Sequence, residues 1–472
     1  MSERRGDRPY SLPLGREAFR RALRVGHGRA MQHARQFGVE GVFDLVVELA
    51  FENEGYDGQT EASYADWLVD MLEMTGRVDG FLQEVERRFA AALEAGAEEA
   101  SGAPTLEELA KRGHERARAL LYSALAGYRS PESFWQSRAL IELDGTDGLI
   151  AVASAMGRRL REDPSLTMEP IPLWLFESVF LGEAENDGRQ ILDEVRSSDS
   201  DVARYLDHLD AVEAAASERR STEQSEEIPE WQGRGGDPDD WKRIVSSWSA
   251  DELIAIIEQQ GKAVSTGHLV AWARTASDEE KRTVLERALR EDDPARLVRF
   301  LRVFLYEMLP FVDERVLALI DHSDGSVQHS AIWAMEHTPH PLIRRAALDR
   351  LQDARADPRL FGLFASGYEP ADATLIEHAL AKADWSDDQW VDGFAWSMRT
   401  IFDGRVAPEA SAFMLHIYEH ARHRTHREVA VECLLRWHTA PEWLLEEAAD
   451  DASGDTRQTV RDHVAKRRKR RS

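Results

Sequence analysis

Apolar residues recur with the period of an α-helix along most of the chain, and this pattern restricts the fold more than any motif does. Between positions 64 and 72, the residues Tyr64, Trp67, Leu68, Met71 and Leu72 are spaced i, i+3, i+4, i+7 and i+8. This spacing predicts the buried face of a helix. Few runs alternate apolar with polar residues, and no hairpin dipeptide separates β-branched segments. The sequence therefore predicts an all-α protein.

Proline residues mark where several of these helices begin. Four prolines stand at predicted helix starts, namely Pro294, Pro358, Pro408 and Pro441. Proline is favoured in the first helical turn because the N–H that it lacks would have no intrahelical partner there. The segments between such marks have about 10–17 residues, a length typical of short packed helices.

One long polar stretch divides the chain. It runs from Ala214 to Asp240, contains Gly and Pro, and lacks helical periodicity before Trp241. We interpret it as a linker or mobile loop. The predicted organisation is an N-terminal helical region (1–213), this linker (214–240), a C-terminal helical region (241–465) and a basic tail (466–472).

The C-terminal region contains a repeat signal. Three apolar pairs are 16 residues apart: Val327 and Ile343, Ala331 and Ala347, and Met335 and Leu351. Two further pairs are 31 residues apart: Val429 and Val460, and Cys433 and Val464. A unit of two short helices cannot bury its apolar faces alone, so such units stack on one another.

Residues 327–351 resemble HEAT repeats, whose helices carry a D-x-x-V-R-x-x-A-x-x-A-L-like pattern. The N-terminal segments YDGQTEASYADWL and LIELDGTDGLIAVASAMG are similar to segments of uncharacterised bacterial HEAT-repeat proteins. The resemblance implies a HEAT-like α-solenoid of stacked short helix pairs, in two parts joined by the polar linker. It implies a scaffold and supplies no catalytic residues.

Charge and cysteine content restrict the partners and the compartment. The net charge is −27, although six of the last seven residues are basic. A chain with this net charge repels phosphate backbones, so we expect no nucleic-acid binding except through the tail Lys466–Arg471.

The single cysteine excludes an intrachain disulfide. Neither a signal peptide nor a membrane-spanning run is apparent. We expect a cytoplasmic protein, from a bacterium if the small share of lysine, seven of 59 basic residues, reflects a GC-rich genome.

An acidic stretch between two predicted helices is the first candidate site. Its candidate binding residues are Glu52, Glu54, Asp57 and Glu61, which surround a Gly-Tyr-Asp-Gly turn. Their spacing does not match a calcium-binding loop. The glycines suit a turn, and Ser63 with Asp66 can form a capping box at the start of the next helix. We interpret the stretch as an acidic helix–helix corner, with a cation site as the alternative.

A histidine-rich helix is the second candidate. His416, Glu419 and His420 match the inverted zinc-protease pattern H-x-x-E-H, and His423 is one turn further on. The neighbouring apolar residues predict that these histidines lie on the solvated face, so a polar helix face is the favoured interpretation. A metal site at His416, His420 and His423 is the alternative.

Tryptophans form the third candidate. Ten of the 13 tryptophans lie at or after position 231, and aromatic side chains can stack on nucleobases. Trp385 and Trp390 lie among several aspartates, an arrangement similar to HEAT-like DNA glycosylases. The acidic composition disfavours that activity, and the spacing of Trp390, Phe394 and Met398 is also that of a helix core.

The combined prediction is a non-catalytic scaffold or adaptor that binds a protein or peptide on an acidic curved surface. Its partner would carry basic segments, and we expect no cofactor. The alternative is an enzyme, either a metal-dependent hydrolase at the histidine helix or a nucleic-acid glycosylase in the Trp-rich region.

Overall fold

The fold is that of a computed structural model of the chain. The structure describes residues 8–51, 63–95, 103–125, 134–163, 188–223, 240–260, 265–351, 357–381, 383 and 385–471. Every regular element in these ranges is a helix, and they contain no strand, which confirms the predicted all-α class. None of the helices in these ranges is both long and apolar enough to cross a bilayer.

Contacts divide the chain into two compact units. Unit 1 contains residues 1–227 and 443–461, and unit 2 contains residues 228–442 and 462–472. The first boundary lies inside the predicted linker 214–240. The beginning of that segment is helical, because α12 continues to Glu223, and residues 224–239 lie outside the described residues. The prediction placed residues 443–461 in the C-terminal region, whereas their contacts place them in unit 1.

Unit 1 is built from a series of helices that surround one apolar core. Its helices are α1 (Arg16–Val25), α2 (Gly28–Phe37), α3 (Phe43–Phe51), α4 (Ser63–Met74), α5 (Val78–Ala95), α6 (Ala103–Lys111), α7 (Glu115–Ala124), α8 (Phe134–Asp144), α9 (Thr146–Glu162), α11 (Gly188–Val195), α12 (Ser200–Glu223), most of α25 (Glu442–Ala448) and the start of α26 (Gly454–Arg471). The predicted stripe on α4, from Tyr64 to Leu72, is buried as expected.

Residues 443–461 pack against α2 and α4 through backbone contacts. The Ala452 N–H donates to Gly26 O at 2.8 Å, and the Trp67 indole N–H donates to Asp450 O at 2.9 Å. Gly28 permits the close approach, because a Cβ at this position would lie 1.9 Å from Glu447 O. These contacts join the end of the chain to its beginning within unit 1.

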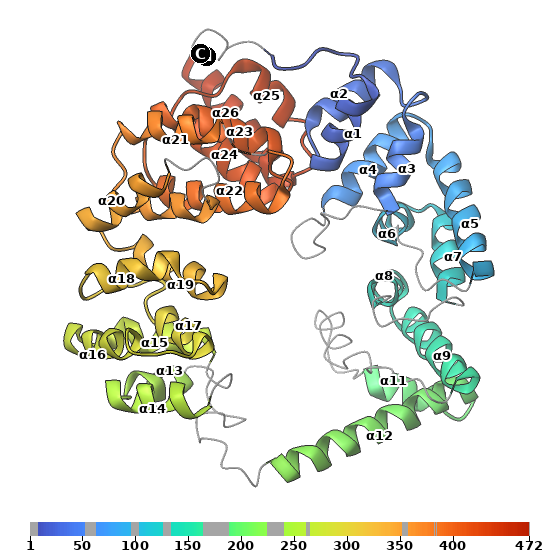
Figure 1. The fold of residues 1–472 in the computed structure, drawn as a ribbon. Coiled ribbons are helices and arrows are strands. Elements are labelled where there is room, and N and C mark those ends of the chain that lie inside the picture. The colour runs from blue at the N-terminus through green and yellow to red at the C-terminus, as the bar shows by residue number, and fades with distance from the viewer. Residues whose placement is uncertain are drawn as a thin grey trace. The chain divides into compact units, whose positions relative to one another are not determined.

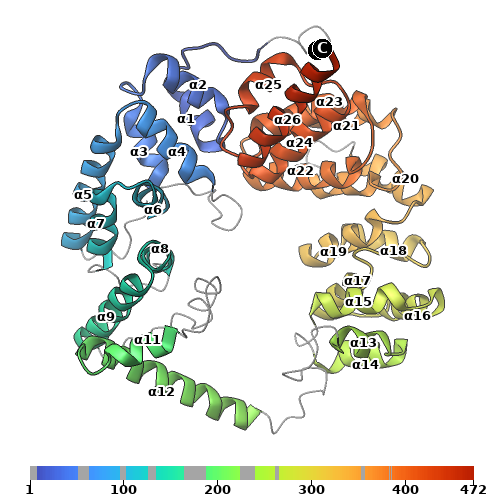
Figure 2. The ribbon, with the colours of Figure 1, turned by 180° about the vertical axis from the view of Figure 1, so that it is seen from behind.

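Unit 2 is a stack of short helices that follow one another in chain order, as both views show (Figures 1 and 2). Its elements are α13 (Asp240–Ser246), α14 (Ala250–Gln260), α15 (Thr266–Thr275), α16 (Asp278–Ala288), α17 (Pro294–Arg302), α18 (Glu314–Ala318), η5 (Leu319–Asp321), α19 (Gly325–Glu336), α20 (Pro341–Arg350), η6 (Pro358–Phe364), α21 (Asp372–Leu380), α22 (Asp388–Phe402), η7 (Pro408–Ala410), α23 (Ser411–His420) and α24 (Arg424–Arg436).

One row of elements runs through this stack, and we call it the capped row: α15, α17, α19, η6 and α22. Each member contacts the next. The last four begin after an aspartate whose carboxylate accepts hydrogen bonds from backbone N–H groups two or three residues later, namely Asp293, Asp324, Asp357 and Asp387. The predicted proline starts are confirmed at Pro294 and Pro358. Aspartate caps therefore recur with the structural repeat of unit 2.

Candidate functional site

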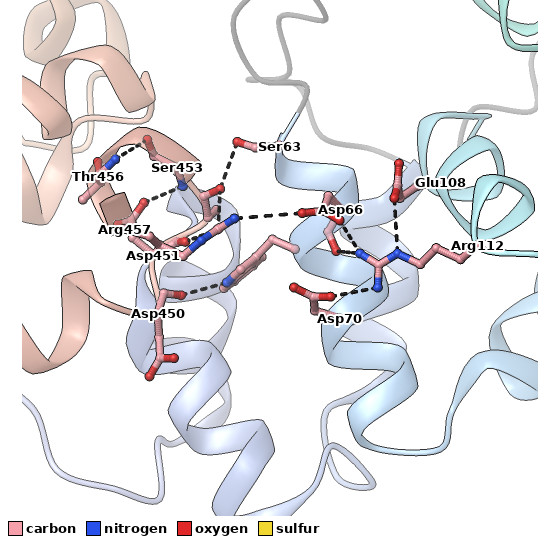
Figure 3. A network of polar contacts seen from close by, with 12 residues as sticks. Ser63, Asp66, Asp70, Glu108, Arg112, Asp450, Asp451, Ser453, Thr456 and Arg457 are labelled. Carbon is pink, nitrogen blue, oxygen red and sulfur yellow. Dashed lines mark hydrogen bonds and ion pairs between the residues drawn. The ribbon is translucent and has the colours of Figure 1, made fainter. Parts of the chain in front are cut away.

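The acidic candidates Glu52, Glu54, Asp57 and Glu61 lie outside the described residues. Three acids that follow them on α4 are described, Asp66, Asp70 and Glu73, and each forms an ion pair with Arg112. Figure 3 shows the first two. Asp70 lies 2.8 Å from the Arg112 guanidinium, and Glu108 lies 3.2 Å from it on the other side. Arg112 therefore joins α4 to the end of α6, and these acids have a structural role.

The start of α4 also contacts the C-terminal segment of unit 1. The Ser63 hydroxyl donates to Ala452 O at 3.0 Å, and Arg457 lies 3.9 Å from the second carboxylate oxygen of Asp66 (Figure 3). The Asp66 carboxylate thus lies between two arginines. This contact was not predicted, because its partner is almost 400 positions away in the sequence.

The tryptophan and histidine candidates lie together in unit 2. The Trp385 indole is stacked on the His416 ring at 4.9 Å and also faces His420 at 5.0 Å. Trp390 is stacked on Phe394 at 5.5 Å and meets Trp385 edge to face. The prediction that the histidines lie on the solvated face is wrong for His416 and His420, because Trp385 covers them. Intramolecular contacts likewise occupy a face of each indole, where a nucleobase would otherwise stack.

The third histidine of the alternative metal site belongs to a different cluster. His423 Nε2 lies 3.4 Å from Asp392 Oδ2, and its ring meets that of His426 edge to face. Burial raises the pKa of Asp392 to about 6 and lowers the pKa of His426 to about 4. In the part of the chain that the structure describes, no three His, Cys, Asp or Glu side chains are grouped to hold a metal. The geometry thus gives no support to the metal-site alternative.

A cavity of about 690 Å³ opens at the N-terminal ends of α15, α17 and α19. Helix starts, hydroxyl groups and two arginines line it: Ser265, Thr266, Leu269, Asp293, Pro294, Ala295, Val298, Arg299, Arg302, Asp324 and Ser326. A volume in the range of about 300–1,000 Å³ is typical of small-ligand sites. No sequence motif predicted this site.

Both arginines of this cavity, Arg299 and Arg302, come from α17. Arg302 Nη1 donates to the Thr266 hydroxyl at 3.3 Å, and neither arginine pairs with a described carboxylate. Nη1 of Arg299 is shielded from solvent and has no hydrogen-bond partner among the described residues. Burial and the nearby Arg302 charge lower the pKa of Arg299. A sequence signal exists, because no acid stands three or four residues from either arginine.

A second surface of unit 2 is an edge formed by four segments, each of which follows one member of the capped row (α17, α19, η6 or α22). We call it the connection edge, and it comprises residues 303–313, 337–341, 365–371 and 403–408. The Leu309 N–H donates to the Thr338 hydroxyl at 2.8 Å. Arg405 donates to Ala365 O at 2.6 Å. These contacts hold successive connections beside one another.

Exposed apolar side chains gather on or beside this edge. The described residues of unit 2 have six exposed large apolar side chains: Tyr306, Met308, Leu342, Leu375, Trp396 and Val406. Tyr306, Met308 and Val406 lie on the connection edge and are 61–70% exposed. Leu342 and Leu375 lie in the first turns of α20 and α21, directly after it. Only Trp396 lies elsewhere, on α22.

The basic tail is helical to Arg471 as part of α26. Its residues from Lys466 to Lys469 are exposed, and Arg467 lies 3.9 Å from Glu442. This long and exposed ion pair contributes little to stability.

Comparison of the chain with protein-family models, with curated proteins and with solved structures found no match. The resemblance to HEAT repeats therefore stays a prediction, and the function has to be argued from the geometry alone.

Proposed function

We propose that the protein is a non-catalytic scaffold or adaptor, and that unit 2 is a HEAT-like helical array that binds another protein along the connection edge. The repeated aspartate caps and the chain-order packing of the capped row support a repeat array. Repeat arrays commonly bind partners on the extended surfaces that their successive units create.

The observation that carries this proposal is the grouping of exposed apolar side chains. Five of the six such side chains named above lie on or beside one edge, and they come from four successive connections. Exposed apolar groups that are contiguous mark interaction sites more often than scattered ones do. Tyrosine and methionine are also enriched at protein interfaces.

The charge of the surroundings indicates the class of partner. Glu369 and Asp403 are exposed on or beside the connection edge, and the whole chain carries a net charge of −27. A partner that places basic residues around an apolar anchor would complement both features. Its association rate would fall with added salt, because ions screen exposed charges over about 10 Å at 0.1 M.

The test begins with affinity purification from the native host and identification of co-purified proteins by mass spectrometry. Each candidate is then purified and mixed with chains that carry a photo-crosslinking amino acid at position 306 or 406. A third chain carries it at the exposed position Asp349, at the opposite end of α20 from the connection edge, as the matched control. We expect crosslinks from 306 and 406 and none from 349.

A substitution experiment completes the test. Tyr306→Asp with Val406→Asp should weaken binding of the purified partner by about tenfold or more, because each change places a charge in an apolar contact. Asp349→Lys should leave the affinity within about twofold. A partner that binds the double variant as tightly as the natural chain would show that the interface lies elsewhere.

A further inference from the structure

The cavity between the starts of α15, α17 and α19 points to a ligand that differs from the proposed protein partner. We infer that Arg299 and Arg302 form a binding site for a phosphomonoester or inorganic phosphate, with the phosphate between the two guanidinium groups. This site is independent of the connection edge, so either proposal can fail without the other.

Neither arginine of the cavity forms an ion pair with a described carboxylate. Arg296, one turn earlier on the same helix, lies 3.2 Å from Glu291 and 3.6 Å from Asp293. Arg299 and Arg302 have no carboxylate partner among the described residues, although they come from a chain of net charge −27. Holding two such cations together at a partly buried place is unfavourable, and a bound dianion would remove that repulsion.

Two carboxylates also line the cavity, and both cap helix starts. One carboxylate oxygen of Asp293 accepts hydrogen bonds from the backbone N–H groups of Ala295 and Arg296, at 2.8 and 3.3 Å. Asp324 caps α19 in the same manner, through Ser326 and Val327. Each helix start carries roughly half a positive charge, which offsets part of its capping carboxylate. The nearby Asp293 carboxylate still attracts Arg299, but with part of both carboxylate charges offset, the two arginines leave the cavity with a net positive charge.

The hydrogen-bond donors of the cavity match a phosphate group. Guanidinium groups bind phosphate oxygens through paired N–H donors, and a phosphomonoester carries about −1.5 to −2 charges near pH 7. Both arginines line the cavity, and Arg302 is oriented there because its Nη1 donates to the Thr266 hydroxyl at 3.3 Å. The Ser326 hydroxyl also lines the cavity.

The remaining lining fits the body of a small phosphorylated ligand. Leu269, Pro294 and Val298 add apolar surface to the cavity. Its volume of about 690 Å³ exceeds the space that a phosphate alone requires. The phosphate-bearing molecule is either a small metabolite or a phosphorylated side chain of a protein, and both present the same group to the arginines.

Calorimetric titration of the full chain tests the site. Inorganic phosphate is titrated at constant ionic strength, up to free concentrations of about 10 mM. We expect saturable binding of one phosphate per chain, and a rise in Tm with phosphate concentration. Arg299→Gln and Arg302→Gln should each weaken binding by about tenfold or more. Arg290→Gln removes the same charge from an exposed position outside the cavity, and should change the affinity by less than about twofold.

Further titrations distinguish the possible sources of the phosphate, and conservative variants control for misfolding. Glycerol 3-phosphate tests a small metabolite, and a phosphoserine peptide is compared with its unphosphorylated form. Binding of either phosphomonoester supports the site. Arg299→Lys and Arg302→Lys keep the charge and should bind with intermediate affinity. Absence of saturable phosphate binding, equal weakening by Arg290→Gln, or preference for an oligonucleotide of phosphodiesters would overturn the proposal.

Discussion

The carboxyl group of Glu336 on α19 occupies the space that a side chain at Gly362 on η6 would need. A Cβ at Gly362 would lie 2.1 Å from Glu336 Oε1. Gly362→Ala should therefore displace the carboxyl group and lower the free energy of unfolding by about 1–3 kcal/mol. Chemical denaturation measures this change. Gly325→Ala is the matched control, because a Cβ at that position meets nothing within 4 Å, and an equal loss in both variants would contradict the explanation.

The same carboxyl group should make stability depend on pH. Burial raises the pKa of Glu336 from 4.5 to about 8, so the folded chain binds a proton that the unfolded chain releases. The resulting stability is complete below pH 4.5 and is lost as the pH rises through 8, with a total on the order of 5 kcal/mol. Glu336→Gln should remove this slope. Denaturation midpoints of both chains between pH 5 and 9 provide the measurement, and parallel curves would show that Glu336 is not the cause.

His426 should produce the opposite slope. Burial lowers its pKa from 6.5 to about 4, and its Nδ1 has no hydrogen-bond partner among the described residues. The unfolded chain therefore binds the extra proton, and stability present above pH 6.5 is lost as the pH falls through 4, by about 3 kcal/mol. His426→Gln should flatten the acid limb of the stability curve. An unchanged acid limb would mean that other groups control it.

A buried ion pair in unit 1 offers a fourth test. Arg29 Nε lies 2.8 Å from Glu447 Oε1, and the two side chains are 10% and 0% exposed. Removing one partner leaves a buried charge, so Glu447→Ala should cost about 3–5 kcal/mol of unfolding free energy. Glu86→Ala breaks the exposed pair with Arg116 and should have no measurable effect. Urea denaturation measures the unfolding free energy of each variant. Similar losses in the two variants would show that the buried pair does not hold residues 443–461 in unit 1.

The histidines of α23 give a test of the metal alternative. His416→Ala with His420→Ala should leave the metal content of the purified protein unchanged, because Trp385 stacks on the His416 ring and lies against the tilted His420 ring. The same variant should lose stability, since the indole loses its contacts with both histidines. Elemental analysis and denaturation measure the two effects. A stoichiometric metal that disappears in the double variant would instead favour an enzyme.

Local patterns predicted the helices well and the long-range contacts poorly. The stripe on α4 and the proline starts depend on neighbouring residues, so periodicity and capping chemistry were enough. The spacing of His416 and His420 correctly placed them on one face, but Trp385, which covers that face, comes from another segment. Whether Arg299 has an ion-pair partner depends on which helices meet around it. That information arises only when the chain is folded.

Residues 443–461 belong to unit 1. The ribosome therefore begins unit 1 first but completes it only near the end of synthesis. Residues 228–442 separate the two parts of unit 1, and a ribosome adds about 5–20 residues per second, so their synthesis takes about 10–45 s. Throughout this interval the Trp67 indole lacks its acceptor on Asp450, and Gly26 O lacks its donor on Ala452. Nascent unit 1 thus presents an incomplete surface, and a chain that terminates before residue 443 never covers it.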